Sequence, residues 1–595
     1  MNKTSARAIS LLLAGGLCLL PFLLPYHQQP VLSFFPEWLA AALGVGAALA
    51  ALGGRGVSAP PLPMPARWLI GFALFLAVRS AVGEQAYPQA SLLAAAVYVV
   101  YAVLVIWLGA QLATAFGVER LAIVIAAFLL VGALANSLAG VIQFYGRPAL
   151  LVDFIADLHS KRAYGNIAQA NLYANYLALG EGALLFLWLR ARVRTAYALA
   201  ALALLVAASA LSDSRSAVLY ALWYAALGWM AVRFQDGTET RRLRFAAYCV
   251  AGAALAAYFT VPWINNAFQL GPPGEADRLL DSSGEYAEPR TKAFQLALRV
   301  FVAAPVAGVG VGEFAGAAFR LGLDPSLTQS GEVWTSPHNL VLHLLAETGA
   351  VGTVLALGGL CVWGWQVARR YRADPQPALW WLIAAAGLQL VHSLVEFPLW
   401  SAHFLGVAAL LIGASTRFET PSPAASRVGW ITATAACAAL VLTLGITLRD
   451  YVRLDATRIT GTTLTLAPAA QAQRDAATMR ELTRGGFMAP VAELWIVLGA
   501  SLDRSDLADK LAISERVART WPANAVVVRH AVFLAFAEKL PKAQSLLARA
   551  LRTFPHRRDA TILILEQALA TDPAAIEPLL AMARSGPAPT PSLQK

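Results

Sequence analysis

The chain has 595 residues, of which 58% are hydrophobic and only 14% are charged, and its formal net charge is +11. Soluble domains are typically about 45–50% apolar and about 25% charged, so a core surrounded by water could not bury this much apolar surface. The composition excludes a disordered protein, a disulfide scaffold and a soluble enzyme, and it indicates an integral membrane protein.

Apolar stretches along the chain predict thirteen membrane-spanning helices, since crossing the hydrocarbon layer takes about 17–25 residues. They are 8–26, 36–54, 67–83, 92–113, 121–144, 170–190, 195–211, 217–233, 245–262, 339–368, 378–397, 400–416 and 428–448. The first stretch has no clear small-residue cleavage site, so we expect a retained span rather than a signal peptide.

Basic residues predict the orientation, because cytoplasmic loops carry an excess of lysine and arginine. Alternate segments on one side hold Lys3, Arg7, Arg55, Arg67, Arg120, Arg190, Arg192, Arg194, Arg233, Arg241, Arg242, Arg244, Arg369, Arg370, Arg372, Arg417 and Arg427. The short loops on the other side hold only Arg147, Lys161, Arg162 and Arg215. We therefore expect a cytoplasmic N-terminus and, with an odd number of spans, a C-terminus outside.

Two long segments are predicted to face outward, a loop at 263–337 and a C-terminal segment at 450–595. In the second, ARTWP at 518–522 recurs as LRTFP at 551–555, an offset close to the period of tetratricopeptide-type helix pairs. Because two copies are a weak basis for a named repeat, we predict only that 450–595 is an all-helical soluble domain. The transmembrane domain is then 1–449.

Polar stretches at the outer ends of the spans are the first functional candidates, because charged groups cost about 2.5–3.5 kcal/mol each within a membrane span. Four of them are predicted to converge on the outer surface: KRAYGNIAQAN at 161–171, DSRS at 213–216, EPRTK at 288–292 and SPHN at 336–339. Arginine forms bidentate hydrogen bonds with phosphate, so these groups suit an anionic headgroup. The alternative is that the arginines only reach lipid headgroups. It is less favoured for Arg215, which lies in a four-residue turn with almost no other polar group.

His338 is the most specific single candidate for a catalytic residue. We predict that Ser336 caps the tenth span, that Pro337 takes its first position and that His338 lies in its first turn. The helix dipole there disfavours imidazolium, which would keep the ring neutral for general-base chemistry. A lone histidine at a helix start is more often structural, so this position alone does not assign a role.

Two further pairs, His343 with Glu347 and His392 with Glu396, are spaced to share one helix face. They could hold a metal or be hydrogen-bonded pairs that lock spans ten and eleven together. The second interpretation is favoured, because no tight His/His/carboxylate motif is present. Glu181, inside the sixth span, is either an interhelical contact or part of the site.

Four stretches together resemble the bacterial O-antigen ligase superfamily. They are RAYGN at 162–166 with Gln169 and Asn171, SRSA at 214–217, PHNL at 337–340 followed by ETG at 347–349, and VHSLVEFPL at 391–399. The resemblance is closest to the protein-directed branch, the O-oligosaccharyltransferases that glycosylate pilins and other envelope proteins. It covers about residues 120–450 well and the C-terminal domain loosely, and Ala170 departs from it where a proline is expected.

The resemblance implies transfer of a preassembled glycan from undecaprenyl pyrophosphate to a protein Ser/Thr hydroxyl, without ATP or a nucleotide sugar. It places the protein in a bacterial inner membrane, with the active site and C-terminal domain in the periplasm. His338, Arg215 and Arg290 match its essential residues. His338 would orient or deprotonate the hydroxyl, and the arginines would hold the pyrophosphate and stabilise its growing charge.

We add as substrate-binding candidates Lys161, Arg162, Tyr164, Asn166, Gln169, Asn171, Asn339, Glu347, His392 and Glu396. No metal or cofactor is required if the arginines neutralise the pyrophosphate. The expected partners are the undecaprenyl-pyrophosphate-linked oligosaccharide donor, a periplasmic or pilin-type acceptor protein and the lipid bilayer, with no nucleic acid.

Three other functions compete with this prediction. An O-antigen ligase that uses lipid A core as acceptor would share the catalytic face, but it would not need a large outer domain. An O-antigen polymerase would join two lipid-linked glycans. A lipid-linked oligosaccharide transporter would place its binding groups near the bilayer midplane, whereas the polar clusters here gather at one surface. An enzyme is therefore favoured.

Overall fold

Every regular element of the computed structural model is a helix within the residues that it describes, which are 3–28, 31–53, 60–234, 237–270, 288–321, 333–416, 422–457, 469–484 and 486–585. The predicted all-α class is confirmed. Parts of the predicted outer loop, 271–287 and 322–332, lie outside the described residues.

Nine helical segments in the described ranges are long and apolar enough to cross a membrane. They comprise α1 (Lys3–Leu17) with the 3-10 turn Leu20–Leu23, α2 (Phe34–Gly53), α3 (Met64–Val82), α4 (Pro88–Leu93) with α5 (Val100–Phe116), α6 (Val118–Tyr145), α7 (Ala170–Leu189), α10 (Thr238–Ala267), α13 (Leu340–Ala373) and α16 (Pro423–Ala456). The other predicted spans coincide with shorter apolar helices, α8 (Thr195–Leu211), α9 (Ser216–Phe234), α14 (Pro377–His392) and α15 (Ala402–Ser415). The chain is a multi-pass membrane protein, and the count of thirteen spans stays a prediction.

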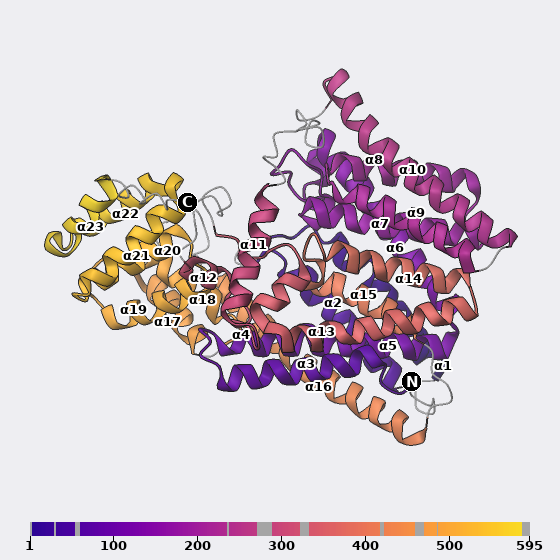
Figure 1. The fold of residues 1–595 in the computed structure, drawn as a ribbon, viewed down its shortest axis with the longest axis horizontal. Helices are drawn as coiled ribbons and strands as arrows, with labels where there is room; N and C mark the ends of the chain where they lie inside the picture. The colour runs from indigo at the N-terminus through magenta and orange to yellow at the C-terminus, as the bar shows by residue number, and fades with distance from the viewer. Residues whose placement is uncertain are drawn as a thin grey trace, which may run out of the picture. The chain divides into compact units, whose positions relative to one another are not determined.

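The first of two compact units comprises Met1–Ala73, Ala95–Ser282 and Leu355–Gly445. Within it α5 packs along α15, α6 along α7, and α10 along α8 and α9, as Figure 1 shows. Small residues set the closest approach: a Cβ atom on Gly109 would lie 2.4 Å from the Leu410 carbonyl oxygen. One on Gly413 would lie 2.0 Å from the Ile106 carbonyl oxygen. Such backbone proximity is typical of helices packed in membranes.

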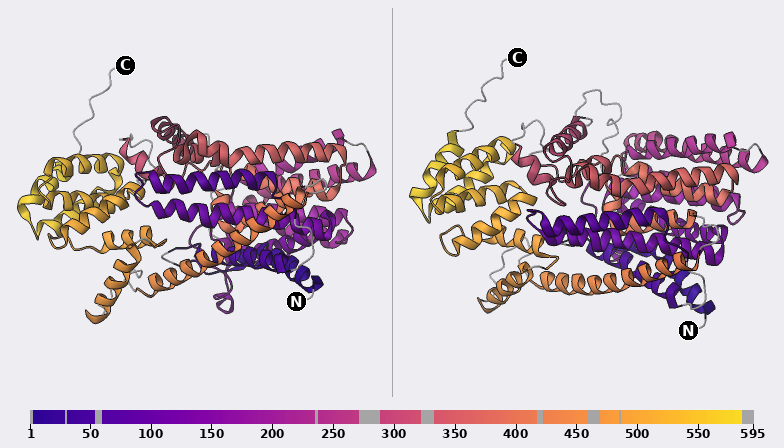
Figure 2. Two further views of the ribbon diagram at one scale, coloured as in Figure 1. Left: turned by 90° about the horizontal axis from the view of Figure 1, so that it is seen from below. Right: turned by 60° about the horizontal axis from the view of Figure 1, so that its bottom comes forward.

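The second unit comprises Leu74–Ala94, Ser283–Val354 and Ile446–Lys595. Besides α4 and the start of α13 it contains α11 (Glu288–Ala303), α12 (Phe314–Arg320), α17 (Ala469–Thr483), α18 (Ala489–Gly499), α19 (Leu507–Thr520), α20 (Asn524–Phe536), α21 (Leu540–Thr553), α22 (Arg558–Leu569) and α23 (Pro573–Ser585). Consecutive helices α19 to α21 pack side by side, as do α22 and α23, in the orange and yellow part of Figure 2. The predicted helical C-terminal segment is confirmed where the structure describes it.

The repeated pentapeptides mark two equivalent helix ends. α19 ends before Trp521, whose backbone N–H donates to the Val517 carbonyl at 2.6 Å. α21 ends before Phe554, whose N–H donates to the Ala550 carbonyl at 2.8 Å. A proline follows each aromatic residue and disfavours helical dihedral angles before it. Trp521 and Phe554 accordingly have ψ angles of 74° and 57°, and the helices stop. The offset of 33 residues therefore reflects a repeated helix–turn–helix junction.

Candidate functional site

Three of the four stretches that carry the family resemblance meet at one side chain in the first unit. This is Asn171 in the first turn of α7, which contacts residues of the stretches at 162–171, 214–217 and 391–399. Its Oδ1 accepts hydrogen bonds from Arg162 Nη2 at 2.8 Å and from Ser214 Oγ at 2.9 Å. Its Nδ2 donates to Glu396 Oε1 at 2.6 Å. Arg162 Nε also donates to the Ser212 carbonyl at 2.7 Å. Sequence positions more than 200 residues apart thus share one hydrogen-bonded network, which we call the Asn171 network.

Positive charge exceeds negative charge around the Asn171 network. Glu396 is buried and Arg162 is half-buried, and Asn171 links the two. Lys161 and Arg215 are exposed next to Arg162 and Ser214 in the chain. Their side chains make no hydrogen bond or ion pair with another residue that the structure describes. Two cationic side chains are therefore exposed next to residues of the Asn171 network.

Asn166 organises the loop that carries Arg162. Its Oδ1 accepts from the Ala156 N–H at 3.0 Å, and its Nδ2 donates to the carbonyls of Leu23 and Phe154 at 2.9 and 2.8 Å. The side chain is 5% exposed. These contacts give Asn166 a structural role in fixing the loop.

Tyr164 and Gln169 also have partners within the protein. The Tyr164 hydroxyl accepts from the His159 N–H at 2.8 Å and donates to the Asp157 carbonyl, and burial raises the pKa of this phenol. Gln169 is the N-cap of α7, with its Oε1 accepting from the Leu172 N–H. Both residues shape the entry into α7.

His392 lies in the first unit as the last residue of α14, where its Nδ1 is 2.7 Å from the Tyr220 hydroxyl. Both side chains are almost fully buried. The prediction that His392 and Glu396 share a helix face is wrong, because α14 ends at His392 and Glu396 lies in the following turn. Pro398 disfavours helical dihedral angles for Phe397, which has a φ of −126° and a ψ of 48°, so the chain leaves the helix in this segment.

His338 lies in the second unit, before α13 rather than in its first turn. Its backbone has a φ of 51°, which is uncommon for a residue with a side chain and is found preferentially at functional sites. The cap is Asn339, whose Oδ1 accepts from the Leu342 N–H at 3.0 Å and whose carbonyl accepts from the His343 N–H at 2.9 Å. The prediction that Ser336 caps the helix is therefore wrong. Asparagine is as favourable an N-cap residue as serine, and Asn339 is the one that directly precedes α13.

Ser336 connects His338 to a buried pair. Ser336 Oγ accepts from the His338 N–H at 3.2 Å and lies 3.2 Å from His343 Nδ1. His343 Nε2 is 3.2 Å from Glu347 Oε1, and each side chain of this pair is 4% exposed. The ring of His338 meets that of Trp334 edge to face, with centroids 5.4 Å apart. His338 is half-buried, and it is held in place by Ser336 through its backbone and by Trp334 through its ring.

Glu347 receives further hydrogen bonds from a glycine-rich turn. Its Oε1 accepts from the Gly312 N–H at 3.0 Å and from the Phe314 N–H at 3.3 Å. His343 Nε2 and Glu347 Oε1 are in contact at 3.2 Å, as their spacing predicted. The hydrogen bonds of Glu347 Oε1 come from this turn, whereas the sequence had suggested hydrogen-bonded pairs that lock spans ten and eleven together.

A break in α13 lets this turn approach. Gly349 has a φ of 64°, and the backbone N–H groups of Ala350 and Val351 donate to the carbonyls of Pro305 and Val306 at 2.8 and 3.2 Å. Such a break inside a helix places unpaired backbone groups where a neighbouring loop can bind them. The loop that leads to Glu313 is thereby attached to the helix that carries Glu347.

Arg290 is the third residue of α11 and is half-buried in the same unit as His338. α11 packs through Leu296, Ala297 and Val300 in a cluster that includes Trp334 and Phe314. Among the described residues there is no group of three or more His, Cys, Asp or Glu side chains that could hold a metal ion.

Sequence reasoning missed Asn136, Gln143 and Tyr220. Gln143 Oε1 accepts from the N–H groups of Tyr164 and Gly165, both at 3.0 Å. Asn136 and Gln143 are two helical turns apart on one face of an apolar span, a signal that could have identified them. Tyr220 gave no such signal, since tyrosine is common in spans.

The comparisons with known proteins agree with this architecture. Residues 174–357 match the family model described as O-antigen ligase. Residues 380–564 match the model described as virulence factor membrane-bound polymerase, C-terminal. The predicted resemblance to the O-antigen ligase superfamily is confirmed.

One curated relative is a general O-oligosaccharyltransferase of Acinetobacter baylyi. It is 25% identical to the chain over 460 residues, which cover 75% of this chain and 76% of the relative. The match therefore extends well beyond the segments that carry the motifs.

Proposed function

We propose that the protein transfers a preassembled oligosaccharide from undecaprenyl pyrophosphate to Ser/Thr hydroxyls of periplasmic acceptor proteins such as pilin. The Asn171 network carries this proposal, because it joins three motif stretches and leaves the Lys161 and Arg215 side chains exposed, with no hydrogen bond or ion pair to another described residue. The similarity to a general O-oligosaccharyltransferase supports the same class of reaction.

On the donor side, the reaction needs positive charge that is fixed before the bond breaks. Glycosyl transfer breaks the bond between the anomeric carbon and a phosphate oxygen, and undecaprenyl pyrophosphate leaves with the bonding electrons. Arginine stabilises such a leaving group by bidentate hydrogen bonds at a preorganised site. Arg215 and Lys161 would bind the phosphates, with Arg290 assisting, while Glu396 and Asn171 keep Arg162 in position.

On the acceptor side, a hydroxyl oxygen forms the new bond to the anomeric carbon and loses its proton. His338 would accept that proton and later release it to water, a contribution typically worth about 10²–10⁴-fold in rate. Its strained backbone and its contacts with Ser336 and Trp334 support this assignment, because a general base must be held in one orientation.

The test is the intact mass of a pilin-type acceptor. The acceptor is co-expressed with a lipid-linked glycan pathway in cells that lack their own ligase, together with the wild-type protein or the His338→Ala variant. We expect a glycan-sized mass increase with wild type and none with the variant at equal expression. A normal shift with the variant would remove the catalytic assignment of His338.

The second candidate is transfer to lipid A core, which the O-antigen ligase match favours. The same cells discriminate the two acceptors, because lipopolysaccharide from each strain reports glycan on the core. Glycan on the core with an unmodified acceptor protein would establish the ligase activity instead. Transfer to neither acceptor would favour the polymerase or the transporter.

A further inference from the structure

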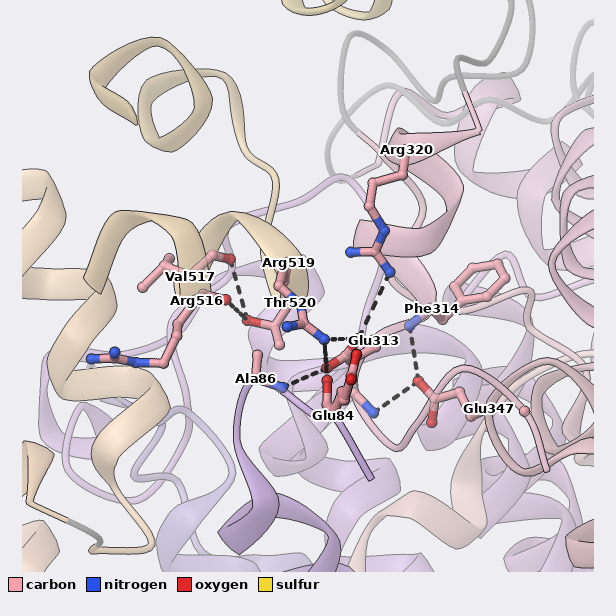
Figure 3. A network of polar contacts seen from close by, with 12 residues as sticks. Glu84, Ala86, Glu313, Phe314, Arg320, Glu347, Arg516, Val517, Arg519 and Thr520 are labelled. Atoms are coloured by element: carbon pink, nitrogen blue, oxygen red, sulfur yellow. Dashed lines mark hydrogen bonds and ion pairs between the residues drawn. The ribbon is translucent and has the colours of Figure 1, made fainter. Parts of the chain in front are cut away.

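Glu313 is a buried carboxylate at the centre of a polar network in the second unit (Figure 3). Its Oε1 accepts from the Ala86 N–H at 2.6 Å. Arg519, near the end of α19, places Nη2 3.3 Å from both carboxylate oxygens, and Arg320 Nη2 is 3.7 Å from Oε2. Arg519 also donates to the Glu84 carbonyl. A buried carboxylate needs such partners, because removing it from water is costly.

The turn that contains Glu313 also binds Glu347. The backbone N–H groups on either side of Glu313, those of Gly312 and Phe314, both donate to Glu347 Oε1. The Glu313 side chain is therefore bound to Arg519, while its flanking amides are bound to the residue that contacts His343. Through Ser336 this chain of contacts reaches the backbone of His338.

Close packing makes this connection stiff. A Cβ atom on Gly316 would lie 1.6 Å from the Arg519 carbonyl oxygen, so α12 and α19 touch at their backbones. The ring of Phe319 stacks on that of Phe554, with centroids 6.1 Å apart. Since packed interiors transmit displacements, a shift of α19 would move the turn at Glu313.

We infer that Arg519 is a positioning residue for His338, acting through Glu313, Glu347, His343 and Ser336. This inference rests on the proposed function. It assigns part of the C-terminal segment to the catalytic apparatus, in addition to any contact with an acceptor protein. Loss of Arg519 would leave Glu313 poorly neutralised and release the turn at 312–314.

Arg516 provides a matched control on the same helix. Arg516 and Arg519 are 38% and 36% exposed, and each pairs with a carboxylate that is only 2% or 3% exposed. Arg516 bonds Glu493, which raises the pKa of the guanidinium. Among the described residues its side chain forms no hydrogen bond or ion pair with Glu313. Arg516→Met thus removes a comparable ion pair without touching the turn at 312–314.

The experiment compares purified full-length wild type, Arg519→Met and Arg516→Met with a synthetic polyprenyl-pyrophosphate-linked glycan and a pilin-type acceptor. We expect Arg519→Met to lower kcat about tenfold or more, since small displacements of catalytic groups have large effects on rate. We expect acceptor KM to change by less than about twofold. Arg516→Met should keep kcat within about twofold of wild type, and Arg519→Lys should recover part of the loss.

Hydrogen exchange gives a readout that does not depend on activity. The Gly312 and Phe314 amides should exchange faster in Arg519→Met than in wild type or Arg516→Met. Equal losses of kcat in the two Met variants, or unchanged exchange of both amides in Arg519→Met, would overturn the inference. If wild type transfers no glycan, the proposed function fails, whereas the exchange result still reports on the coupling.

A double-mutant cycle tests the route through Glu313. If Arg519 acts through this carboxylate, Arg519→Met combined with Glu313→Gln should lower kcat no further than the more damaging single variant. Independent losses that multiply in the double variant would show that Arg519 acts by another path.

Discussion

Arg215 follows Ser214, whose hydroxyl is bound to Asn171, and its guanidinium is exposed. The shape of this group matters as much as its charge, because a planar guanidinium gives two parallel hydrogen bonds to one phosphate whereas an ammonium gives a point charge. The proposed binding of the pyrophosphate by Arg215 therefore depends on the orientation of its guanidinium as well as on its charge.

We predict that Arg215→Lys lowers glycan transfer about 10- to 100-fold, the range expected when one donor to a developing anion is lost. The measurement is the initial rate with purified protein in detergent. Arg192→Lys is the control, since Arg192 is also exposed but lies in the turn between α7 and α8. Activity near wild type in Arg215→Lys would mean that Arg215 supplies charge alone.

Sequence alone predicted the motif residues but not their partners. Arg162, Asn171 and Glu396 were each identified, yet the hydrogen bonds that join them connect positions 225 residues apart. Glu313 and Arg519 gave no signal of a role near the site, because a carboxylate in a glycine-rich turn and an arginine on a soluble helix are ordinary features. Local patterns carry no information about such distant pairings, which the tertiary fold decides.

At the scale of elements, the apolar stretches predicted where helices lie, and most errors fall at their ends. α13 begins at Leu340, so His338 precedes the helix in whose first turn it was predicted to lie. α14 ends at His392, so Glu396 lies outside the helix that was predicted to carry both residues. The reason is that several capping residues compete within a few positions, as Ser336 and Asn339 do. The break at Gly349 was also missed, since a glycine in an apolar span is usually a packing contact.

Gly349 is predicted to be essential for the loop that binds Glu347. A side chain there would adopt a backbone conformation that costs about 1–3 kcal/mol, and its Cβ would lie 2.4 Å from Val306 backbone atoms. Gly349→Ala should therefore lower the melting temperature in detergent and reduce transfer. Gly364→Ala, on the same helix with no atom within 4 Å of the added Cβ, should melt within a few degrees of wild type. Equal melting of both variants would contradict this account of the break.

At the scale of the whole molecule, composition established the membrane class, and loop charges gave an orientation that remains a prediction. The apolar pattern is strong because a span must satisfy its backbone groups internally. It is less decisive for α8, α9, α14 and α15, which the structure places among the shorter helices. α14 has 16 residues and α15 has 14, so their lengths alone do not establish that they cross.

Reporter fusions test both the orientation and the number of spans, because alkaline phosphatase is active only outside the cytoplasm. Seventeen basic residues on one side against four on the other predict inactive fusions after Arg192 and Asp374. If α8 and α14 cross the membrane, fusions after Ser212 and Phe397 should be active. An inactive fusion after Phe397 would mean that α14 and α15 enter and leave on the same side, which lowers the number of spans by two. Activity after Arg192 and Asp374 would reverse the orientation and place the Asn171 network on the cytoplasmic side, which would contradict the proposed periplasmic reaction.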